Sequence, residues 1–80
     1  MRYYKGRRDS NHLEVKNALE LYGWTVAETH MVGDGFPDLV AARSINVLVE
    51  VKTKKGKLEK SQEMFFDLWP GPAVVVTGGS

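Results

Sequence analysis

The chain has 80 residues, of which 26% are charged, with a formal net charge of +1 and no cysteine. A single domain of this length buries only about 60% of the surface that its unfolded chain exposes, so its stability is marginal and self-association is favoured. The lack of cysteine excludes disulfide bonds and a thiolate zinc site. Every apolar run is far shorter than the roughly 18 residues of a membrane span, and no signal peptide follows Met1. We therefore expect a cytoplasmic protein without membrane contact.

The positive charges are segregated along the chain. Nine of the eleven Lys and Arg residues lie in two blocks, residues 2–8 and residues 52–60. Such blocks are typical of a surface that binds nucleic-acid phosphates, although a solvated surface explains them equally well. We expect residues 1–9 to be a basic arm, followed by one domain over residues 10–80. The expected phosphate contacts are Arg7, Arg8, Lys54, Lys55 and Lys57.

The first element predicted by the pattern is a helix from Ser10 to about Tyr22. Asn11 and Glu14 resemble a capping box at its start, and Gly23 is placed to end it. Apolar residues recur at helical spacing between these two ends. The residues of this apolar stripe are Val15, Ala18, Leu19 and Tyr22.

Three strands, a second helix and a last strand are predicted next. The strands are rich in β-branched residues, and a Gly-Asp-Gly turn separates the first two. The second helix presents aromatic side chains and is stopped by Pro70-Gly71-Pro72. The predicted strands cover residues 24–31, 38–42, 45–53 and 73–77, and the second helix covers residues 59–69. This order indicates an α/β fold in which helices flank a mixed central sheet.

The third predicted strand has two different faces. By the two-residue period of a strand, three valines point one way, whereas Leu48, Glu50 and Lys52 point the other way. Asp38, at the start of the preceding strand, can meet Glu50 if the two strands are neighbours. Hard oxygen ligands of this kind hold Mg²⁺ or Mn²⁺ and leave room for water and a phosphate. The carbonyl of Val51 would add a third oxygen, and Lys52 would orient the attacking water or stabilise charge on the phosphate.

These residues also resemble a known family. Pro37-Asp38, followed after eleven residues by Glu50-Val51-Lys52, is similar to the signature of PD-(D/E)XK nucleases. The sequence from Gly35 to Val40, the Gly56-Lys57-Leu58 turn and Gln62 narrow the resemblance to the VRR-NUC domain in its minimal, stand-alone form. The resemblance extends over residues 10–77 and implies a restriction-endonuclease-like αβββαβ core.

The resemblance implies a role for each matching position. Asp38 and Glu50 match the metal-binding acids, and Lys52 matches the catalytic lysine. Gln62 matches a helix glutamine that lines the site. Glu14 matches the family's first-helix acid, as a catalytic residue and metal ligand, although it could equally be only the acid of a capping box. Val51 matches the residue whose carbonyl binds the metal.

The implied activity is a Mg²⁺- or Mn²⁺-dependent DNA endonuclease that prefers branched DNA. Stand-alone domains of this kind resemble Holliday junction resolvases that act as homodimers. By analogy, a nuclease this small and without accessory domains is also expected among phage-encoded proteins that act in the host cytoplasm. A surplus of large apolar side chains also favours a dimer. These side chains are Tyr22, Trp24, Phe65, Phe66, Leu68 and Trp69.

Less specific interpretations remain open at this point. In one alternative, Glu50 and Lys52 are only an ordinary ion pair on a solvated strand face. His12 and His30 are interpreted as surface residues, or as residues with satisfied hydrogen bonds, that have no role in the site. Two other functions compete with the nuclease. The first is a nucleic-acid-binding module that no longer cuts, and the second is a structural or regulatory subunit that binds protein through its aromatic helix.

Overall fold

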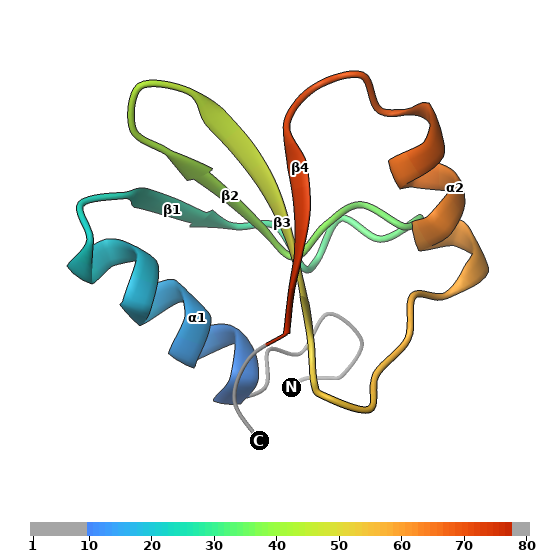
Figure 1. The fold of residues 1–80 in the computed structure, drawn as a ribbon, viewed down its shortest axis with the longest axis horizontal. Coiled ribbons are helices and arrows are strands. Elements are labelled where there is room, and N and C mark those ends of the chain that lie inside the picture. Colours follow the sequence, from blue (N-terminus) through green and yellow to red (C-terminus); the bar gives the residue numbers. More distant parts are fainter. Residues whose placement is uncertain (1–9, 78–80) are drawn as a thin grey trace.

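The computed structural model describes residues 10–77, and the basic arm over residues 1–9 lies outside them. The elements are α1 (Ser10–Leu21), β1 (Thr25–Glu28), β2 (Leu39–Ala42), β3 (Asn46–Lys52), α2 (Lys60–Leu68) and β4 (Ala73–Thr77) (Figure 1). The predicted order of helices and strands is confirmed. Within the described residues, no helix has the length and apolar character needed to cross a membrane.

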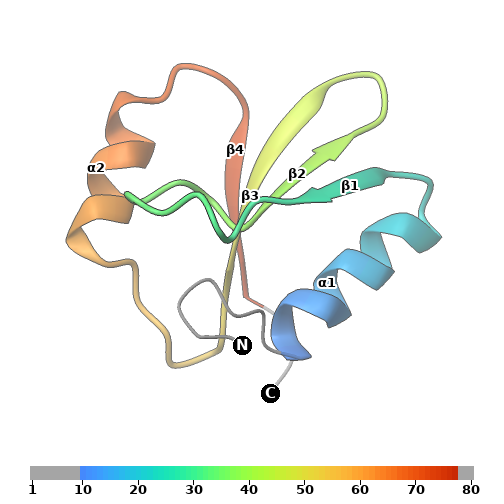
Figure 2. The same ribbon diagram turned by 180° about the vertical axis from the view of Figure 1, so that it is seen from behind.

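The four strands form one mixed sheet in the order β1-β2-β3-β4. The β1/β2 and β2/β3 pairs are antiparallel, whereas β3 and β4 are parallel because α2 carries the chain from one to the other. The two helices lie on opposite sides of the sheet, as both views show (Figures 1 and 2). The protein is therefore a small α/β fold with a helix over each face of a mixed sheet.

The apolar core lies between α1 and the sheet. Val15 of α1 packs with Leu39 of β2 and with Val49 and Val51 of β3, and all four are buried. The alternation along β3 directs the intervening side chains to the α2 face. The two predicted faces of this strand are therefore confirmed, and one of them makes the core.

Helix α1 ends as its sequence predicts. Gly23 has a φ of 94°, in the left-handed region that glycine adopts without strain. The Trp24 N–H donates to the Leu19 carbonyl at 3.1 Å, and the Gly23 N–H donates to the Glu20 carbonyl at 3.0 Å. This pair of hydrogen bonds is a Schellman motif, which satisfies carbonyls at the helix end.

The buried face of α1 differs from the predicted one. Asn11 lies inside the helix and is buried, so the expected capping box between Asn11 and Glu14 is wrong. The inward face passes through Asn11, Val15 and Leu19, which are four residues apart. Tyr22 is 75% exposed, although it was predicted to belong to the apolar stripe. This rotation of the helix leaves Glu14 exposed to solvent.

Strand β1 is shorter than predicted because the chain turns after Glu28. The Thr29 N–H still donates to the Asp38 carbonyl at 2.7 Å, and the Thr29 hydroxyl donates to the Pro37 carbonyl at 2.8 Å. The loop between β1 and β2 then crosses to the other side of the sheet and reaches α2 (Figure 1). These bonds fix the end of the loop next to Asp38.

The tip of this loop packs closely on the start of α2. Gly35 has a φ of 82°, and a Cβ atom at this position would collide with the backbone carbonyl of Ser61. The next residue, Phe36, packs edge-to-face on Phe65 of α2 with 5.4 Å between ring centroids. Glycine is therefore required at residue 35 both by its backbone conformation and by its contact.

Helix α2 packs less deeply than α1, since none of its residues is buried. Phe65 also stacks on Trp69 with 5.1 Å between ring centroids. Leu68 is 79% exposed, and Met64 and Trp69 are exposed as well. The predicted surplus of apolar surface is therefore present on this helix.

Candidate functional site

Asp38 and Glu50 face each other across β2 and β3. The last pair of the β2/β3 register is Leu39 with Val49, so one further step places Asp38 opposite Glu50 on the α2 face. The backbone ladder stops here, and Oδ2 of Asp38 accepts a hydrogen bond from the Val51 N–H at 2.9 Å. The Asp38 carboxylate is thereby held at the edge of the sheet beside its partner acid.

Glu50 is an acid buried on a central strand, with only 1% of its surface exposed. Its burial, followed by the negative charge of Asp38, raises its pKa from 4.5 to about 7, against the opposing effect of the Lys52 ammonium. The Oε1 atom is buried and has no hydrogen-bond partner among the described residues. A buried carboxylate of this kind is costly unless a positive charge or a proton satisfies it.

Two side chains hold the other carboxylate oxygen of Glu50. The Lys52 ammonium lies 3.5 Å from Oε2, and the Gln62 amide donates to Oε2 at 3.0 Å from Nε2. The Gln62 Oε1 atom accepts a hydrogen bond from the Glu59 N–H at 2.8 Å, at the start of α2. Because the amide oxygen is occupied there, the amide nitrogen must face Glu50.

A hollow of about 290 Å³ opens in front of these groups. The side chain of Val51 lies in the core, so the backbone of this residue borders the hollow. Four of the predicted site side chains, together with the Val51 backbone, are therefore brought to one place. The lining residues are Asn11, His12, Asp38, Glu50, Val51, Lys52, Thr53, Gly56 and Gln62.

The residues that α1 contributes to the hollow are Asn11 and His12, and Glu14 is not among them. The His12 Nε2 atom lies 3.5 Å from Oδ2 of Asp38. Sequence reasoning missed both residues because it extended the buried stripe from Val15 and Leu19 towards Ala18 and Tyr22, which are exposed, and not towards Asn11. The detectable signal was their spacing, since Asn11 lies four residues and His12 three residues before the buried Val15.

The predicted phosphate contacts lie only partly within the described residues. Lys54, Lys55 and Lys57 are exposed on the turn after β3, and two residues of this segment, Thr53 and Gly56, line the hollow. The basic turn therefore borders the two acids. Arg7 and Arg8 lie outside the described residues.

The donor chemistry of the hollow fits a hard divalent cation. The partnerless Oε1 atom of Glu50 is a buried oxygen that a cation would satisfy, and Asp38 supplies a second carboxylate. Over residues 10–77, no three His, Cys, Asp or Glu side chains are already gathered into a metal-binding group. Mg²⁺ commonly takes only one or two carboxylates and fills its remaining positions with water and substrate phosphates.

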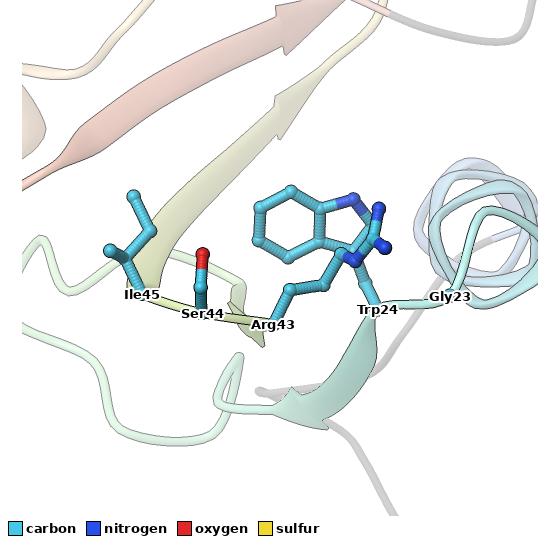
Figure 3. A pocket seen from close by; sticks show the side chains of 5 residues that line it. All are labelled: Gly23, Trp24, Arg43, Ser44 and Ile45. Atoms are coloured by element: carbon cyan, nitrogen blue, oxygen red, sulfur yellow. The ribbon is translucent and has the colours of Figure 1, made fainter.

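The largest of the three hollows described among residues 10–77 lies elsewhere. It has a volume of about 590 Å³, lies at the opposite end of the β2/β3 hairpin and contains no acid or histidine (Figure 3). Arg43 lies beside Gly23 at the carboxyl end of α1, where a cation stabilises a helix. Its lining residues are Gly23, Trp24, Arg43, Ser44 and Ile45. Size alone therefore does not single out the hollow that contains the two acids.

Comparison of the chain with protein-family models, with curated proteins and with solved structures found no match. The chemistry of the site is therefore inferred from its own residues. Among the three hollows described for this structure, only the one at Asp38 and Glu50 combines acids, a lysine and a neighbouring basic turn.

Proposed function

We propose that the protein is a divalent-metal-dependent endodeoxyribonuclease that hydrolyses phosphodiester bonds. The observation that carries this proposal is the meeting of Asp38, Glu50 and Lys52 in one hollow beside a basic turn. The same three residues carry the resemblance to VRR-NUC domains. The observed order of elements is also the αβββαβ order that the resemblance implies.

Each residue of the hollow has a separate role in the proposed hydrolysis. Asp38, Glu50 and the Val51 carbonyl would hold Mg²⁺ or Mn²⁺, which supplies positive charge to the phosphate and lowers the pKa of water. Lys52 orients the attacking water or stabilises charge on the phosphate. The water gives up a proton as its oxygen bonds to phosphorus, the bond from phosphorus to one ester oxygen breaks, and that oxygen takes up a proton from solvent, so that the proton count balances. Gln62 keeps Glu50 aimed at the site.

A cleavage panel tests this proposal. Single-stranded, duplex, flap and four-way-junction DNA would be incubated with the protein in Mg²⁺, in Mn²⁺ and in chelator. We expect cleavage with either metal, none in chelator, and none in a Glu50→Gln control purified in the same way. Cutting by Glu50→Gln at the wild-type rate would assign the activity to a contaminant or to another site.

The same panel separates the two competing functions. DNA binding at low salt without cleavage under any metal condition would identify a nucleic-acid-binding module. Absence of DNA binding at low salt would identify a protein-binding subunit that acts through the exposed side chains of α2. Either result would overturn the nuclease proposal.

We further propose a homodimer that prefers four-way junctions to plain duplex. Leu68 at the end of α2, Trp69 directly after it and Val75 on β4 expose apolar surface that a second copy would cover. A two-fold interface would fix two Asp38/Glu50/Lys52 sites in a geometry that suits a branched substrate of similar symmetry.

Light scattering at micromolar protein and strand-by-strand product mapping on a labelled junction test the dimer. We expect twice the chain mass and paired cuts on symmetry-related strands. A monomer that cuts junction and duplex equally well would refute the dimer proposal and leave the catalytic residues unchanged.

A further inference from the structure

His12 of α1 lies beside Asp38, one of the two acids. Its Nε2 atom lies 3.5 Å from Oδ2 of Asp38, and its side chain is only 13% exposed and lines the hollow. Glu14, the acid expected from the resemblance, is exposed and does not line it. The α1 residues that border the hollow are therefore Asn11 and His12, and His12 is the one that brings an imidazole nitrogen beside an acid.

The distance between His12 and Asp38 suits two ligands of one ion. Two ligands about 2.1 Å from a metal and at a right angle to each other lie about 3 Å apart. The imidazole and the carboxylates are not already gathered into a metal-binding group, so small side-chain rotations must bring them to a common ion. Both the imidazole and the Asp38 carboxylate border open space in which such rotations can occur.

We propose that the His12 Nε2 atom is a metal ligand and that this nitrogen makes the site select Mn²⁺ over Mg²⁺. The inference rests on the proposed function, because Asp38 and Glu50 hold the same ion. Mg²⁺ takes oxygen ligands almost exclusively, whereas imidazole nitrogen binds ions of the first transition row more readily. With His12 as a ligand, the site has one nitrogen donor in addition to its oxygens.

Electron spin-echo spectroscopy of Mn²⁺ bound to the full chain tests the ligand directly. A coordinated imidazole modulates the echo through its nitrogen nucleus, and we expect this signal in the wild type. We expect its loss in His12→Gln, whose amide oxygen has a similar reach. Absence of nitrogen modulation in the wild type would overturn the inference without recourse to any variant.

His30→Gln is the matched control for this experiment. The His30 ring is 5.9 Å from the His12 ring, and its Nδ1 atom lies 3.9 Å from Oε1 of Glu28, but His30 does not line the hollow. We expect the nitrogen signal to persist in His30→Gln. Loss of the nitrogen signal in both variants would show that either substitution disturbs the structure of the site, and would overturn the assignment of the signal to His12.

Calorimetric titration with Mn²⁺ and with Mg²⁺ completes the test. Loss of one ligand should lower Mn²⁺ affinity about tenfold or more in His12→Gln and change Mg²⁺ affinity much less. Equal losses for both ions, or none, would refute the selectivity. Wild-type protein that binds neither ion would remove the metal centre itself, and the proposed function would then fail together with the inference.

Discussion

The two faces of the sheet differ in what they bury: the α1 face buries apolar side chains, and the α2 face buries the Glu50 carboxylate. On the α1 face, five buried apolar residues from three elements pack into a core that stabilises the fold. On the α2 face, β3 carries the buried acid Glu50, and α2 covers this acid although none of the residues of α2 is itself buried. The first face stabilises the protein, and the second places charge where burial is costly. Alternate residues of β3 therefore serve different purposes: Val49 and Val51 pack in the core, whereas Glu50 and Lys52 line the hollow.

Substitutions on neighbouring residues of β3 should have opposite consequences. Glu50→Gln should lower the proposed cleavage by about a thousandfold or more, about 4 kcal/mol of transition-state stabilisation, because it removes a proposed metal ligand with almost no change in volume. Val49→Ala should cost about 1–3 kcal/mol of folding free energy and keep normal turnover in the folded fraction. Single-turnover kinetics and urea unfolding measure the two effects. A large loss of turnover in folded Val49→Ala would show that the faces are coupled.

Gly35→Ala should be the most destabilising change on the α2 face. The added Cβ would strike the Ser61 carbonyl and strain the backbone, at a cost of about 3 kcal/mol. Gly33 also has a φ of 82° but has open space around it, so Gly33→Ala should cost only about 1 kcal/mol. Urea unfolding of both variants measures the difference. Equal losses would mean that the contact between the loop and α2 is unimportant.

The buried acid should make stability depend on pH. Folding raises the pKa of Glu50 to about 7, so between pH 4.5 and 7 the folded state holds a proton that the unfolded state has lost. Stability in chelator should therefore fall as pH rises through this range, by on the order of 3 kcal/mol at most. Glu50→Gln should remove this slope and be the more stable protein at pH 8. A wild-type stability that rises over the same range would contradict the raised pKa.

Charge reversal at Lys54, Lys55 and Lys57 should give the smallest effect per residue. DNA affinity should fall about tenfold or more at low salt, and the slope of log affinity against log salt should flatten by up to about 3. The metal requirement should not change. Lys16→Glu is the control, since Lys16 belongs to α1 and not to the basic turn, and pairs with Glu20 at 2.9 Å. An unchanged salt slope in the triple variant would exclude this turn from the DNA contact.

Much of the fold could be predicted from the sequence because its elements carry strong local signals. Gly23 ends α1 as expected, and the Ala73–Thr77 strand was predicted with its observed bounds. The juxtaposition of Asp38 and Glu50 was also predictable, since a short hairpin fixes the register of its two strands. Local pattern and strand pairing pointed to the same arrangement here.

Other features depended on tertiary contacts that no local pattern contains. The rotation of α1 that buries Asn11 and exposes Tyr22 is set by packing on the sheet, and it decides whether His12 or Glu14 borders the hollow. The contact of Gly35 with Ser61 joins a loop to a helix 26 residues later. Sequence reasoning recognised a turn around Gly35 but had no means of knowing what the turn would touch.

The two hydrogen bonds of the Gln62 amide link the position of the Glu50 carboxylate to the formation of α2. The amide oxygen accepts from the Glu59 N–H at the start of α2, and the amide nitrogen donates to Glu50. Both bonds can form together only when α2 is folded and packed against β3. A growing chain exposes Asp38, Glu50 and Lys52 before residues 60–68 have been synthesised. Until α2 forms, the acids lack the amide that aims one of them. The contact between Gln62 and Glu50 therefore requires both β3 and α2, and it is complete only in a chain that has folded through residue 62.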